Sequence, residues 1–351
     1  MKRFHNMRSR VKEGIFMTIK DLSAQTGYSV GTVSRVLNNQ PNVSEKARQV
    51  ILAAADESGF QLNVNAKQLK QQYSTTILVV VKGVSNEMFG NCVEVLQTRA
   101  LSTRYSLVVD YIEEDANEVQ TAVRLCREKK PLGVVFLGGN RDHFLADFDK
   151  INVPCVLVTN SAEGLPFENL SSVTSDDSLF ARMAIDHMVS LGHRKFAVIG
   201  GDPEISDVVQ MRYQGCMDAF RHHGISFDPA QDYENARFSY ADGYRAAKKL
   251  MKRGRNFTAL FCMSDVMAIG AIRALRDAGK RVPEDMSVMG LDGLAIGEYT
   301  VPKLATVCQA VDTIAETSLD LLLDQIDNKA SARHKIVPVY LEWRESARHI
   351  D

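Results

Sequence analysis

Seven short apolar runs, separated by helix-length amphipathic segments, dominate the chain after residue 73. Each run is continuous rather than alternating, which is typical of strands buried on both faces of a parallel sheet with helices on each side. With 351 residues, the chain is about twice the usual size of one domain. We therefore predict two doubly wound subdomains that face each other across a cleft. The apolar runs are Ile77 to Val81, Leu107 to Val109, Gly133 to Leu137, Cys155 to Val158, Phe196 to Ile199, Leu260 to Met263 and Val288 to Leu291.

The segment before residue 60 has a different pattern, in which short helices begin and end at recognisable residues. Thr18 and Asp21 have the spacing of a capping box, and Gly27 suits the left-handed position that ends a helix. Ser29 and Ser44 can cap two further helices. A helix, a tight glycine turn, a second helix and a supporting helix make the plan of a helix-turn-helix module. Apolar residues recur at helical spacing in the second helix, and the last three of them are predicted core: Val30, Val33, Val36 and Leu37.

Charge is divided unevenly along the chain. Residues 1–72 hold 11 basic and 5 acidic side chains, and the remainder holds 31 basic and 38 acidic ones. A basic module attached to an acidic body favours nucleic acid as the first partner to consider. Most of the basic excess lies in residues 1–16, which lack helical or strand periodicity, so we predict a disordered basic extension there. Either Met1 or Met17 can begin the chain.

Several classes of protein are disfavoured by the motifs that the sequence lacks. The six cysteines lie far apart without a C-x-x-C pair, so we predict free thiols and no metal site. No apolar run approaches the roughly 18 residues of a membrane span, and the N-terminus lacks a signal peptide's apolar core. We therefore expect a cytoplasmic protein without a membrane partner. The absence of a phosphate loop, a G-x-S-x-G elbow and a metal-spaced histidine cluster argues against an enzyme and against a cofactor.

The segment from Met17 to Phe60 resembles the DNA-binding headpiece of the LacI/GalR family of bacterial transcription regulators, with T-V-S-R-V-L-N intact at 32–38. The resemblance continues through LGHRKFAVIGGD, MRYQGCMDAF, MSDVMAIGAIRALRDAGKRVPEDMSVMGLDG and WRESA. It implies an α/β fold, with an all-α helix-turn-helix headpiece followed by two doubly wound parallel-sheet subdomains of the periplasmic-binding-protein type. The expected parts are the extension 1–16, the headpiece 17–62, a hinge helix and linker 63–74, and an effector-binding and dimerisation domain 75–351. Within that domain we expect an N-subdomain of about 75–174 and 308–335 and a C-subdomain of about 175–307 and 336–346.

The resemblance implies two groups of DNA contacts. Hydroxyls near the start of the second helix can hold phosphates, and Val30, Gly31 and Arg35 lie where the family's recognition helix meets base edges. Arg35 can donate two hydrogen bonds to a guanine, which is worth about 1–3 kcal/mol of discrimination. In the segment that resembles the family hinge, Leu69 matches a leucine wedged into the minor groove, and Lys67 can approach phosphate. The predicted DNA contacts are Ser29, Val30, Gly31, Thr32, Ser34, Arg35, Asn38, Asn42, Lys67 and Leu69.

The resemblance also implies an effector site at the carboxyl ends of the strands. Arg212, at the start of a helix, matches an arginine that holds sugar hydroxyls or an anionic group, and Asp292 matches a carboxylate that accepts from hydroxyls. Phe238 matches a ring that stacks on the ligand, and Phe89 is expected in the first strand-to-helix loop. Three shorter neutral residues stand where many relatives have charged or amide groups: Thr159, Asn160 and Ser264. A sugar is the expected effector, with a nucleoside or another small metabolite as the alternative.

These features together predict a homodimeric, sequence-specific transcription regulator, most simply a repressor, whose affinity for double-stranded operator DNA is controlled by a small effector. A dimer is expected because the chain ends soon after WRESA without a leucine-heptad tail. Two rivals share the α/β body: an enzyme and a solute-binding protein of the periplasmic type. A solute-binding protein would need a secretion signal and would have no use for the N-terminal module, and an enzyme is disfavoured by the missing catalytic motifs. Both induction and corepression by the effector fit this plan.

Overall fold

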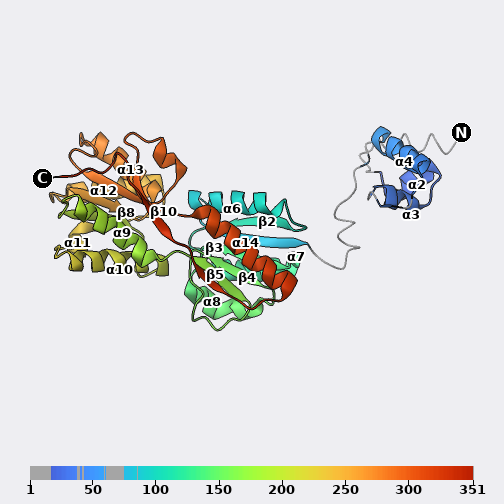
Figure 1. Cartoon of the computed structure of the whole chain (residues 1–351), viewed down its shortest axis with the longest axis horizontal. Helices are drawn as coiled ribbons and strands as arrows, with labels where there is room; N and C mark the ends of the chain where they lie inside the picture. Colours follow the sequence, from blue (N-terminus) through green and yellow to red (C-terminus); the bar gives the residue numbers. More distant parts are fainter. Residues whose placement is uncertain are drawn as a thin grey trace. The chain divides into compact units, whose positions relative to one another are not determined.

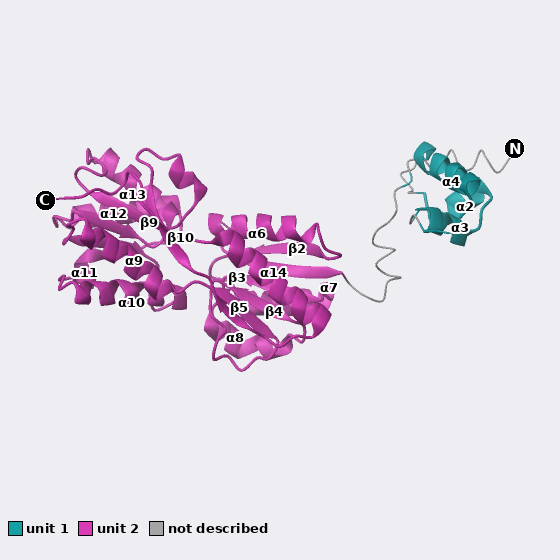
Figure 2. Cartoon of the chain, viewed as in Figure 1, with its two compact units in different colours: residues 1–73 teal, residues 74–351 magenta. Residues whose placement is uncertain are grey.

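The computed structural model of the chain describes residues 17–37, 40–41, 43–58, 60, 75–84 and 86–350. The chain divides into two compact units, residues 1–73 and 74–351 (Figure 2). None of the described helices is long and apolar enough to cross a membrane. The predicted extension, the predicted hinge and four predicted DNA contacts lie outside the described residues: Asn38, Asn42, Lys67 and Leu69.

The first unit contains three described helices, and their sequence signals act as predicted. Thr18 and Asp21 form a reciprocal capping box at the first helix, and Gly27 ends that helix with a φ of 76°. Ser44 accepts a hydrogen bond from the backbone at the start of the third helix. The helices are α2 (Ile19–Thr26), α3 (Val30–Leu37) and α4 (Glu45–Glu57) (Figure 1).

A small apolar core joins these helices. Val33 and Val36 are buried as predicted, whereas Leu37 is only partly buried. Burial of these two valines leaves the opposite face of α3 exposed, because residues three and four apart share one face of a helix. The core consists of Leu22, Val33, Val36, Ile51 and Ala55.

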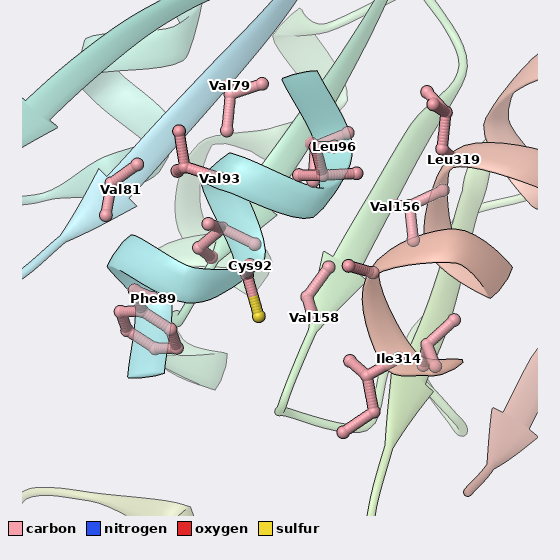
Figure 3. Close-up of a cluster of buried hydrophobic side chains, with 14 of the residues drawn as sticks. Val79, Val81, Phe89, Cys92, Val93, Leu96, Val156, Val158, Ile314 and Leu319 are labelled. Carbon is pink, nitrogen blue, oxygen red and sulfur yellow. The ribbon is translucent and has the colours of Figure 1, made fainter. Parts of the chain in front are cut away.

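The second unit is built on two six-stranded sheets. The first sheet has the strand order β11-β5-β4-β3-β1-β2, and every strand pair in it is parallel. Helices α6 and α14 cover one face, and α7 and α8 cover the other. Figure 3 shows side chains of α6 and α14 packed together on the same side of the strands. The elements are β1 (Thr76–Lys82), α6 (Glu87–Ala100), β2 (Ser106–Ile112), α7 (Glu118–Lys129), β3 (Gly133–Leu137), α8 (Arg141–Asp147), η1 (Phe148–Lys150), β4 (Cys155–Val158), β5 (Leu170–Thr174), α14 (Val311–Asn328) and β11 (His334–Ile336).

The second sheet has the strand order β12-β10-β9-β8-β6-β7, and only its β10–β12 pair is antiparallel. Helices α9 and α10 pack on one face, and α12 and α13 pack on the other. The elements are α9 (Asp177–Ser190), β6 (Phe196–Gly200), α10 (Asp207–His222), α11 (Pro229–Asp232), β7 (Tyr233–Asn235), α12 (Tyr240–Lys252), β8 (Ala259–Cys262), α13 (Asp265–Asp277), β9 (Ser287–Asp292), η2 (Ala295–Glu298), β10 (Ala305–Gln309) and β12 (Val339–Glu342).

All seven predicted strands are present, and the predicted α/β fold with its helical headpiece is confirmed. Five strands were not predicted, because they are short or carry polar side chains in buried positions: β5, β7, β10, β11 and β12. In β5, for example, Ser171 and Ser172 are fully buried and are held by hydrogen bonds to Gln325 and His334.

The chain passes between the two sheets three times, after β5, after β10 and after β11. We call the first sheet with its helices the first lobe (75–174 and 310–337) and the second sheet with its helices the second lobe (175–309 and 338–350). The expected bounds placed Cys308 and Gln309 in the N-subdomain and Ile336 in the C-subdomain. In the structure, Cys308 and Gln309 end β10 of the second lobe, and Ile336 ends β11 of the first lobe.

Candidate functional site

The outward face of α3 presents most of the described DNA contacts that the sequence predicts. Ser29, Gly31 and Arg35 are exposed, and Val30 is 40% exposed. Thr32 and Ser34 are partly buried beside them. Two consecutive turns of one helix thus present hydroxyls, backbone amides and a guanidinium on one side, and an α-helix fits into a major groove.

The turn before α3 is fixed by local hydrogen bonds. The Ser23 hydroxyl donates to the Tyr28 carbonyl at 2.6 Å, which holds the chain across the turn that follows Gly27. Ser29 Oγ then accepts from the Thr32 backbone N–H at 3.2 Å. The start of α3 is therefore held by its own sequence, and its recognition face keeps one orientation relative to α2.

Arg212, the predicted effector arginine, is buried and already has partners. The sequence pattern placed it at the start of a helix. In the structure it lies in the second turn of α10, because α10 begins at Asp207. Its Nε donates to Asp177 Oδ1 at 2.7 Å, and its Nη1 donates to the Met263 carbonyl at 2.9 Å. A guanidinium has five N–H groups, so donors remain for a ligand. Burial raises the pKa of Asp177, which opposes its ionisation, and Arg212 counters that effect.

Asp292, the predicted effector carboxylate, ends β9 with an unusual backbone. Its φ is 125°, a region that side-chain-bearing residues rarely adopt. The side chain is buried, and Oδ1 accepts a hydrogen bond from Gln309 Nε2 at 3.0 Å. Burial raises the pKa of Asp292 to about 7, although Arg212 opposes the rise. A carboxyl group that changes charge near neutral pH is typical of a functional site.

Asp265 supports the strained backbone and was not among the predicted contacts. Its side chain is fully buried at the start of α13, and Oδ2 accepts from the Leu294 backbone N–H at 2.7 Å. The other oxygen accepts from the Thr306 hydroxyl at 2.6 Å. Burial raises its pKa to about 6. Asp265 thus ties the turn that follows Asp292 to the neighbouring helix and strand.

The predicted contacts of the first lobe lie at the ends of its strands. Phe89 is in the first turn of α6 instead of the preceding loop, and it packs in the apolar core (Figure 3). Its ring also lies close to Gly138. Thr159 follows β4 with a φ of 74°, and Asn160 follows it; both are 8% exposed. Among the described residues, no hydrogen bond joins Thr159 or Asn160 to Arg212.

The remaining predicted contacts lie in the second lobe. Phe238 is partly buried between its two apolar clusters, and its ring lies near Gly201 at the end of β6. Ser264 is buried and caps α13, where its Oγ accepts from the Met267 backbone N–H at 3.3 Å. The carbonyl of the preceding residue, Met263, is the one that Arg212 binds, so Ser264 and Arg212 are neighbours.

Side chains from the two lobes meet around this network. The Tyr240 hydroxyl at the start of α12 donates to Glu87 at the start of α6. The Asn140 side-chain amide donates to the Ile205 carbonyl at 3.4 Å. Val266 and Leu294 of the second lobe belong to the apolar core beneath α6. The carboxyl ends of both sheets therefore border one junction, where a bound ligand would contact both lobes at once.

A separate buried carboxylate lies in the first lobe. Glu118 is fully buried, and it accepts from Lys82 Nζ at 2.6 Å and from the Asn140 backbone N–H at 2.7 Å. Burial raises its pKa, but Lys82 and the other donors outweigh that effect, so the pKa is lowered. The charge of Lys82 is thereby neutralised at the end of β1. Within the described ranges, no three side chains of His, Cys, Asp or Glu are arranged to hold a metal ion.

Two family models match the chain. The model described as bacterial regulatory proteins, lacI family, matches residues 18–63, and the model of a periplasmic binding protein-like domain matches residues 185–347. The HTH-type transcriptional regulator MalR of Clostridium butyricum is 33% identical over 343 residues, which are 95% of this chain and all of that protein. The lac repressor dimer bound to operator and an anti-inducer has a TM-score of 0.81 and 26% identity, and the match covers 95% of this chain and 100% of that one. A complex of the transcriptional regulator CelR with cellobiose has a TM-score of 0.70 and 27% identity over 94% of this chain and 99% of that one.

Proposed function

Since the chain belongs to the lacI family of bacterial regulatory proteins, we propose that it binds an operator as a homodimer and that a small effector, a sugar, controls this binding. It is a sequence-specific transcription regulator, and it acts where bacterial DNA lies, in the cytoplasm. The observation that carries the proposal is the joint presence of an exposed recognition face on α3 and a buried polar network at a two-lobed junction. A DNA-binding protein without an effector would not need the buried polar network, and a solute-binding protein would not need the exposed face of α3.

Two copies of α3 would read the two halves of a pseudo-palindromic site. Arg35 reads a guanine, Val30 and Gly31 approach a thymine methyl, and hydroxyls of Ser29, Thr32 and Ser34 hold phosphates. The segment that carries Lys67 and Leu69 would follow in the minor groove, and Asn38 and Asn42 would add polar contacts. A headpiece of low net charge depends on these placed groups and on dimer symmetry rather than on bulk positive charge.

The effector would bind between the lobes and contact both. Arg212 offers its remaining N–H groups, and Asp292 accepts from hydroxyls. Phe89 and Phe238 would flank the ligand, and the neutral groups of Thr159, Asn160 and Ser264 would complete its hydrogen bonds. A cellobiose complex of a structural relative supports a saccharide as the first candidate. Because Asp177 already neutralises the charge of Arg212, an uncharged ligand is favoured over an anionic one.

Control requires that the effector bind one arrangement of the lobes better than another. Operator DNA must then change effector affinity by the same factor as the effector changes operator affinity. A mobility assay with the full chain on the DNA upstream of its own gene tests the proposal, in the presence of ribose, galactose, maltose, cellobiose, adenosine or cytidine. We expect a specific complex whose half-saturation changes with one of the saccharides. A change with a nucleoside alone would contradict the sugar, and the absence of any specific complex would contradict operator binding.

A further inference from the structure

Gln309 is a buried residue at the junction between the lobes, and its side chain contacts both of them. It is the last residue of β10, directly before the chain crosses to α14, and it is only 5% exposed. Its side-chain amide contacts three different parts of the molecule. Nε2 donates to Asp292 Oδ1 at 3.0 Å and lies 3.3 Å from the sulfur of Met88, and Oε1 accepts from the Ser175 hydroxyl at 3.4 Å.

These three partners lie in the second lobe, in the first lobe and in a crossing between the lobes. Asp292 is the proposed effector carboxylate of the second lobe. Met88 lies in the first turn of α6 in the first lobe, next to Phe89. Ser175 lies in the crossing that follows β5, and it is 3% exposed. We propose that Gln309 is the positioning residue of the effector site, which orients the Asp292 carboxylate and transmits its state to α6. This inference rests on the proposed function, because it assigns Asp292 to the effector.

An amide is the side chain that suits this place. It donates through nitrogen and accepts through oxygen without carrying a charge, so it satisfies Asp292 and Ser175 at once. A hydrocarbon side chain would leave a buried carboxylate oxygen without this donor, which is costly in a buried site. A glutamate would place a second negative charge beside the first.

The backbone conformation of Asp292 and the hydrogen bond from Gln309 together fix the position of the Asp292 carboxylate. The φ of 125° and the hydrogen bond from the Leu294 N–H to Asp265 fix where the side chain of Asp292 begins. Gln309 then fixes where its carboxylate points. Since the same amide nitrogen contacts Met88, a change at Asp292 reaches α6 through Gln309 and the buried Met88 side chain.

Protonation of Asp292 offers a way to test the contact from Asp292 through Gln309 to Met88 without a ligand and without DNA. The charged groups that act on Asp292 come from three helices of the second lobe, and they are Arg212, Asp265 and Asp177. From α6 of the first lobe, the Cys92 thiol interacts with Asp292 electrostatically. Burial raises the pKa of Asp292 to about 7, and the hydrogen bond from Gln309 is among the interactions that lower it. Loss of that hydrogen bond must therefore raise the pKa further.

The experiment follows the methyl resonance of Met88 in the full chain labelled with carbon-13 at methionine methyl groups, between pH 5.5 and 8.5. Met88→Leu assigns the signal, and Asp292→Asn should abolish its change with pH. We expect the same loss in Gln309→Leu, because the contact that joins Asp292 to Met88 is gone. A Met88 signal that titrates in Gln309→Leu as it does in the unaltered chain would overturn the proposal.

Gln325→Leu provides a matched control, because Gln325 is also a buried glutamine and accepts from Ser171 at 2.9 Å within the first lobe. It should leave the titration of Met88 unchanged, and a loss there equal to that in Gln309→Leu would refute a specific role. If Gln309→Leu does not fold, Gln309→Glu serves instead, because it also lacks the amide nitrogen that contacts Asp292 and Met88, and the Met88 signal should no longer titrate with the midpoint of the unaltered chain. An unchanged midpoint would also refute the role. These measurements contain no saccharide and no operator, so they can succeed even where the proposed function fails.

Discussion

The exposed face of α3 and the buried network around Arg212 hold their side chains in different ways. On α3, Arg35 and its neighbours extend from a helix whose core contacts lie on the other face. In the network, Arg212 pairs with Asp177 and Gln309 with Asp292, and all four are at most 7% exposed. The recognition face can therefore change without cost to folding, whereas a change in the network alters its partners as well.

This difference implies that the two functions are separable to unequal degrees. A substitution on α3 should affect DNA binding alone. A substitution in the network should affect effector response and stability together, and the balance between the two depends on whether a buried charge loses its partner.

The largest effect is expected from Arg212→Ala. It leaves the Asp177 carboxylate, 3% exposed, without its guanidinium, and removing one member of a buried pair costs about 3–5 kcal/mol. Urea unfolding at pH 7.5 measures the loss, and the effector response should disappear while operator binding persists where the chain stays folded. Arg221→Ala is the matched control, because its ion pair with Asp218 at 2.9 Å is largely exposed and should contribute at most about 1 kcal/mol. Equal losses in the two variants would remove the distinction between buried network and surface.

Arg35→Ala should have the next largest effect, confined to DNA. Loss of a bidentate contact to guanine lowers operator affinity by about 1–3 kcal/mol for each half-site, and the free energy of unfolding should not change measurably. Fluorescence anisotropy on operator and on unrelated DNA gives the ratio of the two affinities. Arg48→Ala, a headpiece arginine outside α3, should leave that ratio unchanged. A retained ratio in Arg35→Ala would show that another residue reads the base.

Asp292→Asn should change the pH dependence of stability. The pKa of about 7 in the folded state lies above the ordinary value for aspartate, so the folded chain binds this proton more tightly. The stabilisation is fully present below about pH 4 and is lost as the pH rises through 7. An asparagine cannot ionise, so the variant should gain about 1–3 kcal/mol over the unaltered chain at pH 8 and little near pH 4. Parallel pH profiles of the two proteins in urea unfolding would argue against a buried, titrating carboxyl group.

The smallest effect is expected at the bridge between Tyr240 and Glu87. Tyr240→Phe removes one hydrogen bond that joins the lobes, which is worth about 0.5–1.5 kcal/mol, so the effector concentration at half-response should rise about two- to tenfold. Titration of operator release with the responding saccharide measures the change. Tyr244→Phe is the control, because that hydroxyl donates to Asp277 within the second lobe at 3.1 Å. A similar rise in the control would mean that the bridge has no special part in the response.

Local signals in the sequence predicted the headpiece and the buried strands. The capping residues Thr18, Ser29 and Ser44 and the turn residue Gly27 act within a few positions of themselves, so their effect is visible in the chain. Continuous apolar runs likewise identified the central strands, because such runs need burial on both faces.

The partners of the predicted effector residues were not visible in the same way. Asp177 lies 35 positions before Arg212, and Met88 lies 221 positions before Gln309. Which of many aspartates meets an arginine depends on how the two sheets are placed, and no local pattern encodes that. The resemblance to a family supplied Arg212 and Asp292, and only the fold adds Asp177, Asp265 and Gln309.

The three crossings between the lobes also set an order in time as the chain is made. The core of the headpiece is complete once residue 60 has left the ribosome, but the core of the first lobe needs α14 and the strand that ends at Ile336. At about 5–20 residues per second, roughly 15–55 seconds separate the two events. The headpiece therefore has all the residues of its core well before the first lobe does, and during that interval each nascent chain carries one headpiece without the junction at which the effector is proposed to bind.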